Sequence, residues 1–282
     1  MDLATIRRIV IIAMFSDDVL FQQLTLKGGN ALNLVYELGS RSSVDVDLSL
    51  ETDFVNIDDS RDRIFTALKA RFAEAGVAVF DEKFSKRPVK QKDGSERWGG
   101  YQIEFKLMGT VKFEAMKGDL DRSRREALVI GSGDRRVFEI QISKYEYCQG
   151  KVQTEFQNYS IFVYTPEMIV AEKLRAICQQ MPEYRMRGYR TARARDFYDI
   201  HSTITARDIS IGSEENKDLV RNIFAAKEVD TKLISRIPDQ KDFHRPDWAS
   251  VILTSSGSLE AFDFYFDFVV DQTQLLESLW KK

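Results

Sequence analysis

The stretch LTLKGGNALNLVYELGSRSSVDVDLSL, residues 24–50, decides how the rest of the chain is interpreted. It begins with a short strand candidate at residues 24–26 and continues into two adjacent glycines. Residues 31–38 then have helical character, and Gly39 predicts the end of that helix. Residues 43–50 are the clearest strand candidate in the chain, because hydrophobic and polar residues alternate along them. The stretch therefore predicts a strand, a turn and a helix, followed directly by a second strand.

Two aspartates lie on one face of the predicted strand at 43–50. A strand has a period of two residues, so Asp45 and Asp47 leave the same face. Ser43 and Ser49 share that face, whereas the opposite face is aliphatic and predicts burial. Two carboxylates this close repel each other unless a cation lies between them, and Mg²⁺ prefers one or two carboxylates together with substrate phosphates. The pattern also fits an edge strand with a solvated polar face.

The two glycines precede the predicted helix and point to a phosphate-binding turn. Gly28 and Gly29 allow the backbone to turn sharply and to approach a ligand closely. Asn30 is a candidate cap for the helix, and exposed N–H groups at a helix start bind phosphate. Most such glycine pairs are only turns, so the evidence here is their position immediately before the aspartate strand.

A third acidic residue could complete a two-metal site, in which the ions are about 3.5–4 Å apart. Glu139 lies in a predicted strand over residues 136–143, and Glu104 lies in a similar one over 101–108. Both have a hydrophobic residue on either side. Either residue could instead be an outward-facing strand residue, so Glu139 is a candidate for the site and Glu104 is its rival.

The second half of the chain opens with a helix whose start is well marked. Thr165 followed by Pro166 is a typical cap with proline at the first helical position. An apolar stripe follows at helical spacing: Val170, Leu174, Ile177, Cys178 and Met181. Lys173 lies at the edge of this stripe and can point into a cleft. The alternative is a surface lysine whose aliphatic stem covers apolar neighbours.

A basic segment leads into the next predicted helix. Residues 173–195 contain seven basic side chains and one acidic one, in the order Lys173, Arg175, Glu183, Arg185, Arg187, Arg190, Arg193 and Arg195. Tyr184 and Tyr189 are interleaved, which suits phosphate contacts with base stacking but also fits a solvated surface. On the helix, Arg195 and Asp199 are four residues apart and can pair, and Asp196 lies on the same side as Asp199.

The composition of the whole chain excludes several classes of protein. Its 41 basic and 44 acidic residues give a net charge of −3, which excludes a wholly basic nucleic-acid coat. Two cysteines exclude a disulfide framework, and two histidines exclude a His-rich metal site. No apolar run reaches the roughly 18 residues of a membrane span, and we expect neither a signal peptide nor a membrane partner but a cytoplasmic protein. Further helices are predicted at 3–22, 60–75 and 113–127, and strands at 77–80 and 160–164.

The order of these motifs carries more information than any one of them. The segments LKGGNAL (26–32) and RSSVDVDL (41–48) resemble the opening motif of the AbiEii family of nucleotidyltransferases. These proteins are toxins of type IV toxin–antitoxin and phage-abortive systems and belong to the DNA polymerase β-like superfamily. Residues 165–176 resemble the family's helix with an essential lysine, and RDFYDI (195–200) resembles its Arg-Asp-x-x-Asp motif. The resemblance covers roughly residues 5–205.

The sequence departs from the family's pattern at two positions. Ser42 stands where the family often has an aromatic or aliphatic residue, and Asn30 stands where it often has Ser or Thr. Residues 206–282 match the family only in being helical and rich in apolar and aromatic side chains.

The resemblance implies an α/β (α+β) fold: a nucleotidyltransferase domain with a mixed sheet over residues 1–165 and a mostly helical domain over 166–282. Residues 238–246 are expected to be a connector in the second part. The active site would lie in the cleft between the two domains. The reaction implied is Mg²⁺-dependent transfer of a nucleoside monophosphate from an NTP to a hydroxyl. The expected acceptor is the 3′ end of tRNA, and the alternative is a Ser, Thr or Tyr hydroxyl of a protein. The implied partner is an antitoxin encoded alongside.

The resemblance also assigns roles to individual residues. Two Mg²⁺ ions would be held by Asp45, Asp47 and Glu139. Nucleotide phosphates would contact Lys27, Gly28, Gly29, Asn30, Ser43, Lys173 and Arg195. Asp196 would orient Lys173 or the acceptor, supported by Asp199. The alternatives are a non-catalytic nucleotide- or RNA-binding module and a small-molecule nucleotidyltransferase.

Overall fold

The computed structural model describes residues 1–38, 45–89, 97–131, 133–186, 189–255 and 257–281. A seven-stranded sheet runs in the order β3-β4-β5-β2-β1-β7-β6. Its strands are β1 (Leu24–Lys27), β2 (Val46–Leu50), β3 (Val77–Arg87), β4 (Gly100–Gly109), β5 (Phe138–Ser143), β6 (Val152–Phe156) and β7 (Tyr159–Val163). β2 is parallel to β5 and β1 to β7, whereas the other neighbours are antiparallel. The mixed sheet confirms the predicted fold class.

The alternating pattern of the aspartate strand appears as predicted in β2. Val46 and Leu48 are completely buried in the core, whereas the intervening Asp47 is only half-buried on the opposite face. Residues 43 and 44 of the predicted strand lie outside the described residues, as does Gly39.

The helix after the glycines begins earlier than the sequence suggests. α3 (Gly28–Asn30) starts at the first glycine and continues into a π-helical turn, η1 (Ala31–Val35). Asn30 is therefore inside this helical segment and does not cap it. The N-cap position is taken by Lys27, which makes no side-chain capping hydrogen bond.

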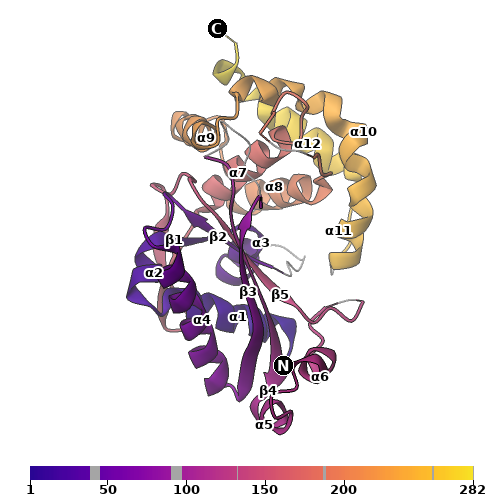
Figure 1. Cartoon of the computed structure of the whole chain (residues 1–282). Helices are drawn as coiled ribbons and strands as arrows, with labels where there is room; N and C mark the ends of the chain where they lie inside the picture. Colours follow the sequence, from indigo (N-terminus) through magenta and orange to yellow (C-terminus); the bar gives the residue numbers. More distant parts are fainter. Residues whose placement is uncertain (39–44, 90–96, 132, 187–188, 256, 282) are drawn as a thin grey trace.

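Three helices of the first half pack near the sheet: α1 (Leu3–Phe15), α2 (Asp18–Gln23) and α4 (Ile57–Glu74) (Figure 1). The single helix predicted at 3–22 is split because Asp17 caps a new one, accepting hydrogen bonds from the N–H groups of Val19 and Leu20.

The helix predicted at 113–127 is likewise two short helices, α5 (Thr110–Ala115) and α6 (Leu120–Glu126). Lys117 and Gly118 between them have positive φ angles, which a continuing helix does not permit. These helices lie at the end of the sheet that is distant from the helical half (Figure 1).

The sequence did not predict β6. This strand pairs with β7 at the edge of the sheet, and most of its side chains face solvent. An edge strand of this kind lacks the buried alternation on which the prediction of strands depends.

The elements after β7 are helical. Four main helices are α7 (Pro166–Cys178), α8 (Ala194–Arg207), α9 (Glu214–Ala226) and α12 (Phe262–Gln274), and α7 packs against both α8 and α9. Shorter helices are η2 (Thr231–Gln240), α10 (Lys241–His244), η3 (Arg245–Asp247), α11 (Trp248–Thr254) and η4 (Glu277–Leu279). The helical half sits at one end of the sheet (Figure 1). The division into two domains at residue 165 stays a proposal.

Two expectations for this half have definite outcomes. Thr165 caps α7 through the N–H of Met168, and Pro166 occupies its first turn, as predicted. The expected connector at 238–246 was wrong, because this segment is made of short helical turns, and Pro246 fits at the start of η3, where its missing N–H is not needed. Among the described residues, no helix has both the length and the apolar character to cross a membrane.

Candidate active site

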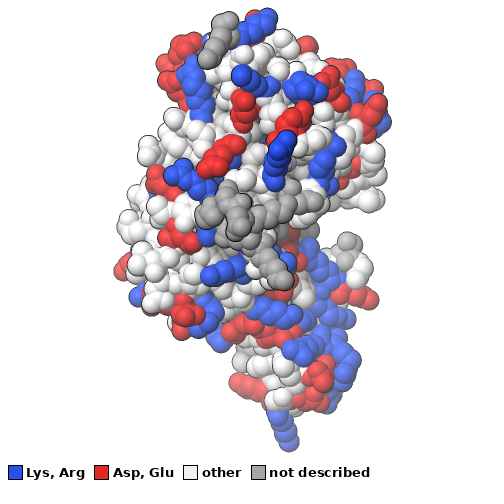
Figure 2. Space-filling model, turned by 45° about the horizontal axis from the view of Figure 1, so that its top comes forward, with Lys and Arg blue, Asp and Glu red and all other residues white. Residues whose placement is uncertain are grey.

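A cavity of about 700 Å³ lies where the sheet meets the helical half. Its lining combines the end of β1 and the start of α3, one face of β2, parts of β4 and β5, and residues of α7 and α8. Asp45, Asp47, Lys173 and Asp196 all contribute to it, so the structure brings together predicted residues that are up to 151 positions apart. On the face shown in Figure 2, acidic and basic side chains are interspersed over both halves.

The surroundings of Asp47 in the cavity disfavour its charged form. Burial above all, together with Glu172 and Asp45, raises the pKa of its carboxyl to about 6 against the attraction of Lys27. Among the residues that the structure describes, none forms a hydrogen bond or ion pair with the Asp47 carboxylate. A desolvated carboxylate without a partner is a natural ligand for a cation.

Gly28 is shaped by its contact with Asp47. Its φ angle is 70°, and a Cβ atom at this position would lie 3.0 Å from Asp47 Oδ2. A side chain here would therefore be strained and would also crowd the carboxylate. The glycine turn brings the backbone close to Asp47, and its predicted approach to a phosphate stays a prediction.

Asn30 and Ser43 do not add to the described cavity. Asn30 is completely buried outside the lining, where its amide donates to the backbone oxygen of Asp45 and accepts a hydrogen bond of 3.5 Å from Arg7 Nη1. It positions the aspartate strand rather than facing the cavity, which corrects its expected contact with nucleotide. Ser43 lies outside the described residues.

Glu139 lies next to Asp45 but is held by an arginine. Arg135 Nη2 is 2.7 Å from Asp45 Oδ1 and 3.1 Å from Glu139 Oε1. The Glu139 carboxylate also accepts a hydrogen bond of 3.0 Å from Gln102, and burial and Asp45 raise its pKa. Its register partner on β4 is the rival Glu104, which accepts from the same Gln102 amide. Neither glutamate lines the cavity.

The expected three-carboxylate metal site is therefore not assembled. Within the described ranges, no group of three or more His, Cys, Asp or Glu side chains has the geometry to hold a metal ion. Asp45, directly before β2, and Asp47 nevertheless fit one divalent cation, because both line the cavity and Asp47 is desolvated with no partner among the described residues. The remaining ligands would come from water and from phosphate oxygens, as is usual for Mg²⁺.

Lys173 is buried, so the surface-lysine alternative was wrong. Its side chain is 6% exposed, and Nζ donates to Asp196 Oδ1 at 3.1 Å and to Asp199 Oδ2 at 2.6 Å. Asp199 is thus engaged with Lys173 rather than with Arg195, the partner expected from helical spacing. Lys173 is thus held on the cavity wall, and its orientation by Asp196 for function stays a prediction.

Asp196 is charged despite its complete burial. Burial alone would raise the pKa of its carboxyl, but Arg193 and Lys173 hold it well below its usual range. Arg193 occupies the N-cap position of α8, and the sequence had placed it only among the basic residues of 173–195. Arg195 is exposed at the rim of the same cavity.

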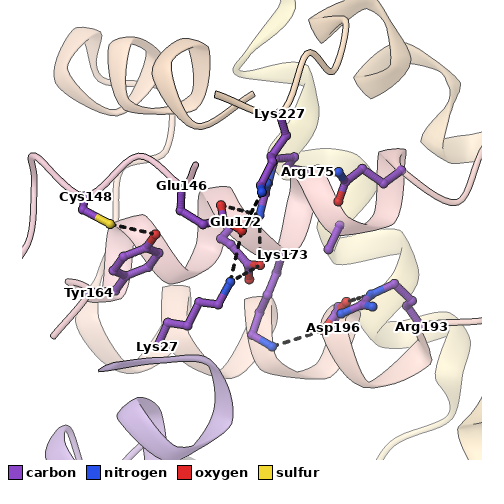
Figure 3. A network of polar contacts seen from close by, with 12 residues as sticks. Lys27, Glu146, Cys148, Tyr164, Glu172, Lys173, Arg175, Arg193, Asp196 and Lys227 are labelled. Carbon is purple, nitrogen blue, oxygen red and sulfur yellow. Dashed lines mark hydrogen bonds and ion pairs between the residues drawn. The ribbon is translucent and has the colours of Figure 1, made fainter. Parts of the chain in front are cut away.

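A buried ion-pair network connects the sheet to the helical half (Figure 3). Its hub is Glu146, which lies 3.3 Å from Lys27, 3.1 Å from Arg175 and 3.6 Å from Lys227. Glu172 on α7 completes it, 3.7 Å from Lys27 and 3.1 Å from Arg175. All five residues line the cavity.

The environment of the network lowers the pKa of both Glu146 and Lys227. Burial would raise the pKa of Glu146, but Arg175, Lys27 and Lys227 hold it well below its usual range. Burial and the neighbouring Arg175 and Lys27 lower the pKa of Lys227 to about 8, although Glu146 opposes this. Sequence reasoning did not identify Glu146 or Lys227, since neither belongs to a motif. The only indication of this network in the sequence was the spacing of Glu172 and Arg175 on one helix.

The two tyrosines of the basic segment have different surroundings. Tyr184 is buried and its hydroxyl donates to the backbone oxygen of Lys227 at 3.1 Å, so it supports the fold. Tyr189 is 67% exposed and lines the cavity, as does Trp98 from the sheet half. Arg187 of this segment lies outside the described residues.

Comparison with known proteins gives one family match. The family described as nucleotidyl transferase AbiEii toxin, type IV TA system, matches residues 10–268. Among solved structures, the chain is similar to JHP933 from Helicobacter pylori, with a TM-score of 0.49 and 15% identity over 98% of this chain and 91% of that chain. It is also similar to an antigenic nucleotidyltransferase-like protein from Paracoccidioides brasiliensis, with a TM-score of 0.37 and 16% identity over 90% and 94%. None of the curated proteins compared with the chain matches it.

Proposed function

The chain belongs to the AbiEii family of nucleotidyltransferase toxins of type IV toxin–antitoxin systems, and from this premise we propose the reaction that its cavity performs. The reaction is transfer of a nucleoside monophosphate from an NTP to a hydroxyl group of an acceptor, with release of pyrophosphate. The observation that carries the proposal is the convergence in one cavity of Asp45 and Asp47, the Gly28 turn and the buried Lys173.

Asp45 and Asp47 are the proposed ligands of Mg²⁺. A divalent cation bound there would neutralise phosphate charge and lower the pKa of the attacking hydroxyl. Asp47 supports this role because its carboxylate is desolvated at the cavity wall and the Gly28 backbone packs against it. The turn at Gly28 and Gly29 brings main chain next to this position, where the phosphates of the NTP would lie.

Lys173 is proposed to contact the triphosphate as a positive point charge. Its two carboxylate partners come from α8, so its ammonium group is already positioned before a nucleotide enters. Preorganisation of this kind reduces the entropy that is lost on binding. Lys27 is held in the same way by Glu146 and Glu172 and presents a second positive charge.

The proposed acceptor is a nucleic acid, the 3′ end of tRNA. Arg195 and Tyr189 are exposed where they line the cavity, and they combine a phosphate-binding charge with a surface for base stacking. Modification of tRNA in the cytoplasm would arrest growth, and a genetically linked antitoxin would relieve that arrest. The antitoxin follows from the toxin–antitoxin family.

The test is incubation of the purified protein with each α-labelled NTP, Mg²⁺ and either total tRNA or nucleic-acid-free cell extract. We expect label in tRNA from one or two of the NTPs, and loss of label with Asp45→Ala or Asp47→Ala. If label appeared in a protein or in a small molecule instead, that molecule would be the acceptor in place of tRNA. No transfer to any acceptor would reject the assignment of this cavity.

A further inference from the structure

We infer that Arg135 takes the place of a second metal ion, so that the site holds a single divalent cation at Asp45 and Asp47. The inference rests on the proposed function for the presence of that one cation. It replaces the two-ion arrangement that the resemblance implied, and it gives Arg135 a role as a positioning residue.

One nitrogen atom of Arg135 lies between two carboxylates. Nη2 is 2.7 Å from Asp45 Oδ1 and 3.1 Å from Glu139 Oε1. A Mg²⁺ ion bridging these oxygens would need them at about 2.0–2.1 Å, in the space that this nitrogen occupies. The guanidinium and a metal ion therefore exclude each other at this position.

Arg135 is fixed from several sides and does not merely touch the carboxylates. Its Nε donates to the backbone oxygen of Val137 at 3.0 Å, and its own backbone oxygen accepts from the N–H of Ile130 at 2.8 Å. The planar guanidinium group is thus anchored at one edge while its other side bridges Asp45 and Glu139. An arginine cannot lose its proton in a protein, so the positive charge is permanent.

The strand register explains why Glu139 pairs with an arginine instead of joining a metal site. β2 and β5 are parallel, with Val46 opposite Ile140 and Asp47 opposite Gln141. Glu139 therefore lies beside Asp45, one pleat away from Asp47, and outside the cavity lining. The residue that faces the cavity beside Asp47 is the uncharged Gln141.

The environment of Asp47 leads to the same arrangement. Its carboxylate is desolvated and has no hydrogen-bond or ion-pair partner among the described residues, so one divalent cation would satisfy it there.

The experiment counts Mn²⁺ ions bound to the full-length protein, with Mn²⁺ standing in for Mg²⁺ and detected by electron paramagnetic resonance. The wild type should bind one Mn²⁺ per chain, and Glu139→Gln should still bind one. Arg135→Gln should bind two, because the freed carboxylates can hold a second ion. Arg135→Gln with Glu139→Gln should return to one, and Arg136→Gln, a neighbouring arginine that donates to the Ala127 backbone, is the matched control that should stay at one.

Opposite results would overturn the inference. Two ions in the wild type and one in Glu139→Gln would place Glu139 among the ligands, and this comparison does not depend on the folding of an Arg135 variant. A count of one in a folded Arg135→Gln, or of zero in the wild type, would also reject it. If the wild type binds one Mn²⁺ but transfers no nucleotide to any acceptor, the single-ion site stands and the proposed function fails.

Discussion

Lys173 Nζ on α7 donates to Asp196 Oδ1 on α8 at 3.1 Å, although the two residues are 23 positions apart. Both side chains are almost completely buried, and both line the cavity that contains Asp45 and Asp47. The ion pair thus joins the helix with the proposed phosphate-binding lysine to the helix that orients it. Arg193 and Asp199 extend it into a four-residue group.

The first prediction is that Lys173 and Asp196 act as a unit. Lys173→Ala should weaken NTP binding by about 1.5–3 kcal/mol, the usual contribution of one charge-assisted contact. Asp196→Ala should have a similar effect because the lysine loses its orientation, and the double variant should be little worse than either single one. Calorimetric titration with NTP measures this, with the exposed Lys69→Ala as control. If the losses of the two single variants add up in the double variant, Lys173 and Asp196 act independently. If both single variants keep full toxicity in cells, neither residue has the proposed role.

The second prediction concerns the dependence of stability on pH at Asp47. Its pKa is about 6 in the folded protein and near 4 in the unfolded chain, so folding opposes its ionisation. The free-energy cost of ionising Asp47 in the folded protein is absent below pH 4. It grows between pH 4 and 6 and is complete above pH 6. Asp47→Asn should therefore raise stability at pH 7.5 by about 3 kcal/mol without Mg²⁺, and by only about 1 kcal/mol at pH 4.5, where little of this cost has developed.

Thermal unfolding in EDTA across this pH range measures the effect. Mg²⁺ should raise the Tm of the wild type but not of Asp47→Asn, since a ligand stabilises only the form that binds it. Asp45→Asn is the control and should not be stabilising, because Asp45 is paired with Arg135. An equal gain at both pH values would mean that desolvation of Asp47 is not the cause.

The third prediction compares two glycines with the same backbone conformation. Gly28 and Gly76 have φ angles of 70° and 69°, but only the Cβ of the former would meet a neighbour, 3.0 Å from Asp47 Oδ2. Both alanine variants should lose about 1–2 kcal/mol of stability from backbone strain. Only Gly28→Ala should also lose nucleotide transfer. Chemical denaturation measures the stability of both variants, and the transfer assay measures their activity. Equal activity of the two variants would contradict the proposed role of this turn.

The fourth prediction is that Glu146 holds the two halves of the chain together. Glu146→Gln leaves Lys27, Arg175 and Lys227 buried around an uncharged amide, which should cost about 3–5 kcal/mol. Because the folded pKa of Glu146 is below its unfolded value, its contribution is complete above the unfolded pKa and is lost as pH falls toward the folded pKa. The difference from wild type should shrink below about pH 4.5. Urea unfolding tests this, and the exposed Glu155→Gln should match wild type.

The fifth prediction separates Glu139 from Glu104. Glu139→Gln removes one of the two anionic partners of Arg135, so Asp45 loses its fixed position and transfer should fall roughly tenfold, equivalent to about 1.4 kcal/mol. Glu104→Gln should change the rate by less than about twofold on the same scale, because the Glu104 carboxylate interacts with Gln102 and Lys83 and does not line the cavity. If Glu104→Gln lowered the transfer rate more than Glu139→Gln, Glu104 would take the place of Glu139 in the site.

Local sequence patterns predicted much of the fold because the relevant forces act over a few residues. Alternation in β2, the Thr165 cap with Pro166 and the apolar stripe of α7 all appear in the structure where they were expected. Errors occurred where a single residue ended an element, as Asp17 does between α1 and α2. The strand β6 was missed because an exposed edge strand has no buried face to reveal it.

The sequence alone determined which face of β2 carries Asp45 and Asp47, since the period of a strand follows from its backbone. It also indicated that Lys173 and Asp196 belong to one site, through motif order. Only the tertiary structure showed that Arg135 lies between Asp45 and Glu139 and that Glu146 gathers three cations. These contacts join residues up to 119 positions apart, and their partners are selected by strand register and helix packing. The partner of a charged side chain cannot be identified from the sequence, because electrostatic attraction depends on distance in space and on burial. Both are set by the fold as a whole.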